Sequence, residues 1–304
     1  MRLMKKILSV LIVASALFAI TKDANAQQDP MYTQYMDNML IINPGYAGSQ
    51  ETGKFLMVSR NQWVSFEGAP KTLSFSYQTP YKDKNIGLGF SVMNDKIGPQ
   101  KQTGVYFDYS YFLRLSEKYK LGMGLKGGVS FYRAALTDLD PIDPDPIFSS
   151  DIYKNFLPNF GVGFYLYSDN TYVGFSIPKL IRNKITRDDY ETDYIQKEEI
   201  HFYFNAGQKF VFGNNLQLKV NTLVRYVRIA PVTWDITTML GFKEKFWVGG
   251  MFRLNDSYGI LAQFKMKKIT IGYSYDITYS TLSTFNAGTH EIMFGYNFDL
   301  FKRL

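Results

Sequence analysis

The sequence contains no cysteine and only two histidines, His201 and His290, among its 304 residues. The absence of cysteine excludes disulfide bonds and thiolate metal sites. Two histidines leave little material for a metal centre. We therefore expect neither a bound metal nor a cofactor.

Long apolar runs are also missing beyond the first 20 residues, and mean hydropathy is slightly negative at −0.17. A spanning helix needs about 20 predominantly apolar residues, so none is expected in the rest of the chain. A closed β-barrel is the other structure that can cross a membrane, because its strands satisfy every backbone hydrogen bond.

A strong excess of charge is missing as well. The whole chain has 34 basic and 27 acidic residues, and the part after residue 26 has 30 and 26, a net charge of +4. The basic residues are scattered rather than clustered. Nucleic acid is therefore not expected as a partner.

The first 26 residues have the three-part layout of a secretory signal peptide. Arg2, Lys5 and Lys6 form the charged start, residues 7–20 form an apolar run, and an Ala-Asn-Ala cleavage site ends at Ala26. We predict cleavage after Ala26. An uncleaved membrane anchor is the alternative, but the apolar run of 14 residues is short for a spanning helix.

Aromatic residues are abundant at 17%, and 24 glycines accompany them. In residues 119–133 the side chains alternate strictly, so that Leu125 and Phe131 share one face and Lys126 and Ser130 share the other. Such alternation over about 10 residues is typical of strands in an outer-membrane barrel. About 14 segments show it, at residues 54–66, 71–79, 85–94, 102–115, 119–133, 158–167, 171–177, 199–212, 216–228, 232–242, 245–254, 257–266, 268–277 and 288–301. The predicted fold is all-β, a transmembrane antiparallel β-barrel with a non-regular N-terminal segment.

The connections between these segments are sorted by length. All turns after even-numbered segments are short, whereas the three long connections, residues 134–157, 178–198 and 277–288, follow odd-numbered segments. Outer-membrane barrels have short periplasmic turns and long outer loops, so this sorting favours a barrel whose first strand runs outward. A soluble β-sandwich is the alternative, but it predicts no such sorting.

Gly122, Gly124 and Gly127 form a GxGxxG string. A dinucleotide site needs this pattern between a strand and a helix, but here it lies inside a predicted strand. We therefore interpret these glycines as small residues on a crowded lumen face or at a bend.

Asp138, Asp140, Asp143 and Asp145 cluster in the longest predicted outer loop. Carboxylates can hold Ca²⁺, but this spacing does not fit an EF-hand loop. A solvated loop that its prolines stiffen is the favoured interpretation.

Each histidine starts a predicted strand beside an acidic residue, His201 near Glu199 and His290 next to Glu291. A histidine with a carboxylate can activate water or a serine. Because no convincing nucleophile motif accompanies either pair, the sequence favours a protein that is not an enzyme.

The first predicted hairpin contains Arg60, Gln62 and Trp63. Trp63 lies where an aromatic-belt residue is expected, near the outer rim. We expect Arg60 and Gln62, on the opposite face, to point into the lumen.

Five stretches together resemble one known family. They are DPMYTQYMDNMLIINPGYAGS (residues 29–49), RNQWVSFEGAPKT (60–72), NDKIGP (94–99), YVGFSIPKL (172–180) and THEIMFGYNF (289–298). In this order they are similar to the PorP/SprF family of Bacteroidetes type IX secretion system membrane proteins. No single stretch is specific, but the combination is.

The resemblance implies an outer-membrane barrel without catalytic residues or a small-molecule substrate. It also implies partners, namely outer-membrane lipid and either periplasmic secretion components, a secreted surface protein with a C-terminal sorting domain, such as an adhesin in gliding species, or both. A passive or substrate-selective channel is the alternative function. The hallmark positions, implied to bind partners or to form structural motifs, are Gln34, Tyr35, Met36, Asn43, Pro44, Gly45, Tyr46, Gly48, Arg60, Gln62, Trp63, Pro70, Gly98, Pro99, His290 and Glu291.

Residues 27–53 fit neither a helix nor a strand pattern and precede the predicted barrel of residues 54–304. A barrel of 14 strands is wider than the eight-stranded kind that side chains alone can fill. We expect the segment either to plug the lumen or to lie across the periplasmic mouth. A disordered tail is the alternative.

Overall fold

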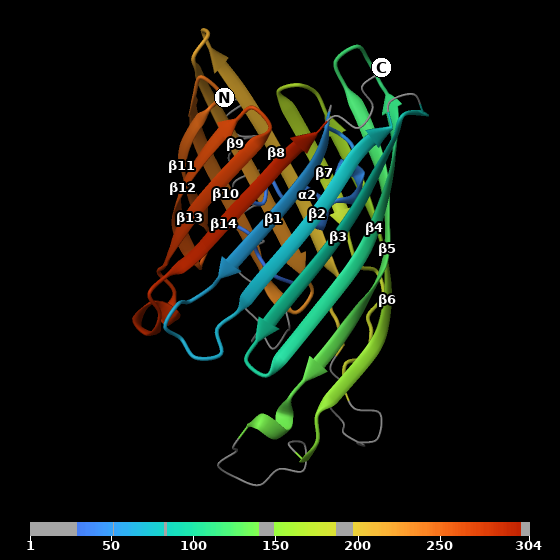
Figure 1. Cartoon of the computed structure of the whole chain (residues 1–304), viewed down its shortest axis with the longest axis vertical. Coiled ribbons are helices and arrows are strands. Elements are labelled where there is room, and N and C mark those ends of the chain that lie inside the picture. Colours follow the sequence, from blue (N-terminus) through green and yellow to red (C-terminus); the bar gives the residue numbers. More distant parts are fainter. Residues whose placement is uncertain (1–28, 51, 82–83, 140–148, 187–196, 299–304) are drawn as a thin grey trace, which may run out of the picture.

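The structure, a computed structural model, describes residues 29–50, 52–81, 84–139, 149–186 and 197–298. The described part of the chain is a closed β-barrel (Figure 1). Its strands are β1 (Gly53–Asn61), β2 (Lys71–Tyr81), β3 (Ile86–Ile97), β4 (Gln100–Arg114), β5 (Lys120–Ala134), β6 (Ile152–Tyr167), β7 (Thr171–Ile177), β8 (His201–Phe212), β9 (Leu216–Val227), β10 (Ala230–Phe242), β11 (Phe246–Arg253), β12 (Ser257–Met266), β13 (Ile269–Thr278) and β14 (Thr289–Phe298).

Every strand pairs antiparallel with the next one in the sequence, and β14 pairs with β1 to close the cylinder. The closing register runs from Gly53 opposite Phe298 to Asn61 opposite His290. Closure removes the free sheet edges that an open sheet would expose. The predicted antiparallel transmembrane barrel of about 14 strands is confirmed.

The two faces of the wall differ as the alternation predicts. On β5, Leu125 and Phe131 are exposed on the outside, whereas Lys126 and Ser130 are buried on the inside. An apolar outer band of this kind is what a lipid-facing wall requires. In the described residues, no helix has the length and apolar character needed to cross a membrane.

The first strand is shorter than predicted. It ends at Asn61 rather than at residue 66, because Trp63 and Ser65 adopt φ angles of 48° and 74°. A positive φ is incompatible with a strand, so the chain turns here instead of continuing the ladder. Trp63 therefore lies in the turn that follows β1.

The hairpin of β5 and β6 is longer than predicted. β6 begins at Ile152 rather than at residue 158, and its register against β5 shifts between Ser130 and Tyr132. This irregularity lets the two strands continue past their neighbours, and Figure 1 shows them reaching beyond the rest of the wall.

The long connections gather at the end of the barrel that is lower in Figure 1, and the short turns gather at the other end. We call these the long-loop end and the short-turn end. Two short 3₁₀ helices, η3 (Leu136–Asp138) and η5 (Thr281–Phe285), belong to the long-loop end. The predicted signal peptide and Asp140, Asp143 and Asp145 lie outside the described residues.

The core of the molecule lies in the lumen, and residues 29–50 form much of it. This segment contains one turn of helix, α2 (Met39–Ile42), and a 3₁₀ turn, η1 (Pro44–Tyr46). Tyr35, Met39 and Leu40 are fully buried and pack against inward-facing residues of the wall. We call residues 29–50 the lumen segment.

An arginine on the outer face should destabilise the barrel, whereas an apolar exchange there should not. Leu125, with 60% of its surface exposed, lies near the middle of β5. We expect Leu125→Arg to lower the free energy of unfolding by about 2–4 kcal/mol, because the charge must enter hydrocarbon. Urea unfolding in lipid vesicles measures this, with Leu125→Phe as the control. Equal stability of the two variants would argue against a lipid-facing β5.

Candidate functional site

The candidate site is the lumen segment together with the wall residues that hold it. The segment starts beside residues near the long-loop end, crosses the lumen, and enters β1 at the short-turn end. Charged and polar contacts fix it at several levels along this path.

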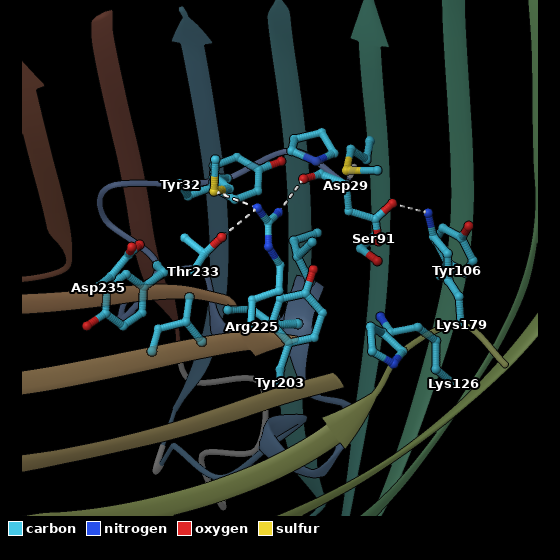
Figure 2. A pocket seen from close by; sticks show the side chains of 18 residues that line it. Asp29, Tyr32, Ser91, Tyr106, Lys126, Lys179, Tyr203, Arg225, Thr233 and Asp235 are labelled. Carbon is cyan, nitrogen blue, oxygen red and sulfur yellow. Dashed lines mark hydrogen bonds and ion pairs between the residues drawn. The ribbon is translucent and has the colours of Figure 1, made fainter. Parts of the chain in front are cut away.

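Three wall residues hold Asp29, and Figure 2 shows two of them, Lys179 and Arg225. The Lys179 Nζ lies 2.7 Å from Asp29 Oδ1, and Arg225 Nη1 donates to the Asp29 carbonyl at 2.8 Å. The Asp29 N–H donates to His201 Nε2 at 3.2 Å. Burial favours the neutral acid, but the Lys179 ammonium holds the pKa of the Asp29 carboxyl below its ordinary value. The carboxylate is therefore ionised at neutral pH.

His201 is neutral in this arrangement. Its Nε2 accepts the Asp29 N–H, so the ring proton is on Nδ1, which lies 3.0 Å from the Glu199 carbonyl oxygen. The Glu199 carboxylate instead pairs with Arg182. His201 and Glu199, two residues apart in the sequence, therefore do not contact one another through their side chains.

Arg60 on β1 forms the centre of a buried charge cluster. Its Nη1 lies 3.1 Å from Glu291 Oε2, and its Nη2 lies 2.9 Å from Asp276 Oδ2. The same carboxylates bind the lumen segment, because Glu291 accepts the backbone N–H groups of Thr33 and Gln34 at 2.9 and 2.8 Å. The Thr33 hydroxyl donates to Asp276 at 2.6 Å and accepts from Arg60 at 2.8 Å.

Arg253 on β11 forms a second buried ion pair beside this cluster. Its guanidinium donates to both carboxylate oxygens of Asp235, Nε at 2.8 Å and Nη2 at 2.7 Å. Two parallel bonds of this kind fix the guanidinium plane as well as its charge. Arg253 Nη2 also reaches the Tyr32 carbonyl at 3.3 Å, so this pair too contacts the lumen segment.

Asp37 lies nearer the short-turn end than these clusters. Gln263 Nε2 donates to Asp37 Oδ2 at 2.8 Å, and Lys54 Nζ lies 3.7 Å from Oδ1. Gln263 Nε2 also reaches Gln34 Oε1 at 3.3 Å. Residues 34 and 37 are therefore joined through one wall side chain.

The Asn-Pro-Gly-Tyr stretch forms η1 and packs on the opposite wall. Asn43 caps it, because its Oδ1 accepts the Gly45 N–H at 2.9 Å, and Pro44 occupies the first position, where no N–H is needed. Asn43 Nδ2 donates to the Phe164 carbonyl at 3.0 Å, and Ser110 Oγ donates to the Gly45 carbonyl at 3.2 Å. The cap therefore fixes the turn locally and ties it to β6 and β4.

Wall glycines let η1 approach the strands closely. A Cβ on Gly124 would overlap the backbone of Pro44 and Gly45, and one on Gly122 would overlap the Gly45 carbonyl. Gly127, the third glycine of the GxGxxG string, has only the ring of Phe160 near its Cβ direction. The interpretation of Gly122 and Gly124 as small residues on a crowded lumen face agrees with this packing.

The remaining hallmark residues of the segment are buried in the lumen. Tyr46 packs edge-on against Tyr165 with ring centroids 5.3 Å apart, and Gly48, at φ 71°, donates to Gln78 Oε1 at 3.0 Å. Tyr35 is fully buried, and Met36 packs beside a cluster that contains Trp247. These residues lie together in one packed unit with Gln34 and η1.

The hallmark residues outside the segment are divided between two places. Arg60 and Glu291 point into the lumen, as described above. The others lie at the long-loop end, where they shape turns or contact the outer face. Gln62 donates its N–H to the Pro70 carbonyl at 2.9 Å, and Trp63 donates its N–H to Thr289 Oγ1 at 3.1 Å. Gly98 turns at φ 53° before Pro99, and His290 Nδ1 lies 2.7 Å from the Tyr273 hydroxyl. His290 and Glu291 therefore face opposite sides of β14.

Several wall residues that hold the segment were not singled out from the sequence. They are Lys179, Arg225, Arg253, Asp235 and Asp276. All but Lys179 are charged residues on the lumen face of a strand, and this position is the signal that could have marked them. Within the described residues, no group of three or more histidines, aspartates or glutamates could hold a metal ion.

A small cavity of about 50 Å³ remains between the segment and the wall, lined in part by Tyr32, Tyr106 and Tyr203 (Figure 2). A space of this size holds a few water molecules. This cavity therefore has no room for a larger solute.

Removing the cation shared by Glu291 and Asp276 should weaken the whole assembly. Arg60→Met keeps much of the side-chain volume but leaves two buried carboxylates unpaired, at a cost of about 3–5 kcal/mol of unfolding free energy. Adding Glu291→Gln to Arg60→Met removes one of these charges, so we expect the double variant to regain part of the loss. Denaturant unfolding measures all three proteins. A double variant less stable than Arg60→Met would contradict the shared-cation arrangement.

Comparison with solved structures gives outer-membrane barrels of low similarity. Omp33 of Acinetobacter baumannii is 10% identical, with 81% of this chain and 99% of that chain covered and a TM-score of 0.47. The toluene transporter TbuX of Ralstonia pickettii is 9% identical, with 91% and 96% covered and a TM-score of 0.46. A Pseudomonas aeruginosa FadL homologue is 12% identical, with 90% and 96% covered and a TM-score of 0.43. Comparison with curated proteins gives no significant match.

The comparison with family models, unlike these structural matches, identifies the family of the chain. The family described as type IX secretion system membrane protein PorP/SprF matches residues 24–296, nearly the whole chain. The match covers the lumen segment, strands β1 to β13 and β14 as far as Tyr296. The chain belongs to the PorP/SprF family of type IX secretion system membrane proteins and forms an outer-membrane β-barrel.

Proposed function

We propose that this chain is a non-enzymatic component of the type IX secretion system that binds protein partners at the ends of its barrel, while the lumen segment keeps the lumen closed. The observation that carries the proposal is the set of bonds between the lumen segment and the wall all around it. The lumen segment has at least one side-chain or backbone contact with each of strands β1, β2, β4, β6, β7, β9, β11, β12, β13 and β14.

Binding rather than catalysis suits the chemistry of the lumen. His201 Nε2 is occupied by the Asp29 N–H, so it has no lone pair left for a general base. His290 lies on the outer face against the Tyr273 hydroxyl, away from the Glu291 carboxylate. The buried carboxylates of Glu291, Asp276 and Asp235 are already paired with arginines, and Glu291 also accepts backbone N–H groups of the segment.

Exposed aromatic residues at the long-loop end suit a protein partner. Phe156 on the projecting part of β6 has 68% of its surface exposed, and Phe285 in η5 has 64%. Aromatic side chains supply much of the binding free energy in protein interfaces. We propose that the partner exported to or held at the cell surface contacts this end.

A closed lumen should show little ion conductance in planar bilayers. We expect the wild-type protein to give no large steady currents, because the lumen segment fills the barrel. Lys179→Met with Arg225→Met should give openings, since Asp29 then loses both a cation and a donor. Far-ultraviolet circular dichroism is the control for barrel formation. Large steady currents through the wild type would favour the alternative, a channel.

Loss of the aromatic side chains should impair secretion without affecting barrel assembly. In Phe156→Ser with Phe285→Ser, we expect the amount of cell-surface cargo to fall by about fivefold or more, which corresponds to roughly 1 kcal/mol of lost binding free energy. Glu117→Ser with Lys118→Ser, two exposed residues at the short-turn end, is the matched control. Secretion at the wild-type level in the Phe156 and Phe285 variant, with the protein correctly assembled, would contradict a partner surface there.

A further inference from the structure

A second hollow, of about 320 Å³, lies at the short-turn end, between the lumen segment and the wall. Turn residues between β6 and β7 form part of its rim, and inward-facing residues form its sides. Its lining contains four lysines and two aspartates: Lys54, Lys209, Lys219, Lys265, Asp37 and Asp169. We call this hollow the lysine vestibule.

Two of these lysines are held in place without a carboxylate partner. The Nζ atoms of Lys219 and Lys265 lie 4.1 and 5.4 Å from the ring centre of buried Trp247, on the same indole. Among the residues that the structure describes, neither forms an ion pair. A cation–π contact offsets only part of the cost of bringing two like charges together in a half-buried place. A bound anion would offset the rest.

A neutral donor points into the same hollow. Asn221 is 4% exposed, and its Oδ1 accepts the Tyr172 hydroxyl at 3.0 Å. Its Nδ2 is buried and has no hydrogen-bond partner. A buried donor without an acceptor costs free energy, so the site lacks an acceptor atom beside Asn221. Lys219, Lys265 and Asn221 together offer donors only.

The acidic side chain nearest to these lysines is already occupied. Asp37 accepts from Gln263 and lies beside Lys54. Burial alone would raise its pKa, but the ammonium groups of Lys54, Lys265 and Lys219 hold the pKa of the Asp37 carboxyl below its ordinary value. The positive field in the vestibule therefore acts on any carboxylate there, and its four lysines outnumber its two aspartates.

We propose that the lysine vestibule binds carboxylate side chains of an acidic, extended segment of a partner protein, with Lys219, Lys265 and Asn221 as its ligands. A lipid headgroup does not suit this place, because the lining residues face the lumen and the acyl chains lie outside the wall. Tyr167 and Tyr172 on the rim add aromatic surface for a peptide. The inference rests on the proposed function, in which a partner protein reaches the end of the barrel.

Fluorescence anisotropy with two labelled probes tests the site on the purified full-length protein in detergent. The probes are a peptide of alternating glutamate and glycine and the same peptide with glutamine for glutamate. We expect the glutamate peptide to bind, with an affinity that falls as salt is added, and the glutamine peptide to bind at least about tenfold more weakly. Equal binding of both probes would overturn the proposal.

Variants locate the binding. Lys219→Gln with Lys265→Gln should weaken glutamate-peptide binding at least about tenfold, and Asn221→Asp should weaken it further by repulsion while it keeps the bond from Tyr172. Lys118→Gln with Lys120→Gln removes the same charge from exposed positions at the same end and should change binding less than about twofold. An equal loss in both double variants would reduce the site to non-specific charge attraction and overturn it.

Three further outcomes separate this inference from the proposed function. Inorganic phosphate that competes as tightly as the glutamate peptide would identify a small-anion site and overturn a peptide partner. A wild-type barrel that is quiet in bilayers but does not bind the glutamate peptide would overturn the vestibule alone. A barrel that conducts steadily and loses this current with Lys219→Gln and Lys265→Gln would overturn both, since the lysines would then line an ion path.

Discussion

Charge pairing between the inner wall and the lumen segment is the interaction on which the rest of the structure depends. A cylinder of 14 strands is too wide for its own side chains to meet across the middle. Its inner face nevertheless carries Arg60, Glu291 and Asp276, all fully buried or nearly so. Buried charges are tolerated only when they are paired and hydrogen-bonded. The backbone of Thr33 and Gln34 supplies donors that the wall lacks.

The close packing of the lumen segment constrains which residues the wall can carry. Glycine inside a strand weakens it, because it adds conformational entropy to the unfolded chain and contributes no side chain. Gly87 and Gly124 nevertheless face the lumen, and a Cβ on either would overlap the backbone of the segment. The loss within the strand is offset by the contacts that η1 gains. The wall and the segment thus stabilise each other, and neither is suited to stand alone.

The sequence predicts the wall well, because alternation with a period of two residues reports directly which side chains face lipid and which face the lumen. On β5 the predicted alternation matches the structure, with Leu125 and Phe131 on the outside and Lys126 and Ser130 on the inside. The period carries no information about which lumen residues meet. Asp276 and Glu291 are on neighbouring strands, but Arg253 and Tyr32 are 221 residues apart, and only closure brings them together. Trp63 was placed on a strand for a similar reason, since a positive φ leaves no mark in the hydrophobic pattern.

The same segment makes the two ends of the lumen chemically different. Near the long-loop end, Asp29 brings a carboxylate to Lys179 and Arg225 offers its donors to backbone and side-chain acceptors, so the wall cations there are paired. At the short-turn end the segment brings only Asp37, which cannot neutralise all four lysines of the vestibule. Because opposite charges in a low-dielectric lumen attract strongly, an end whose charges are already balanced has little attraction left for a charged ligand. The unbalanced end retains it. The path of one short segment therefore determines which end of the lumen has balanced charges and which end keeps an excess of positive charge.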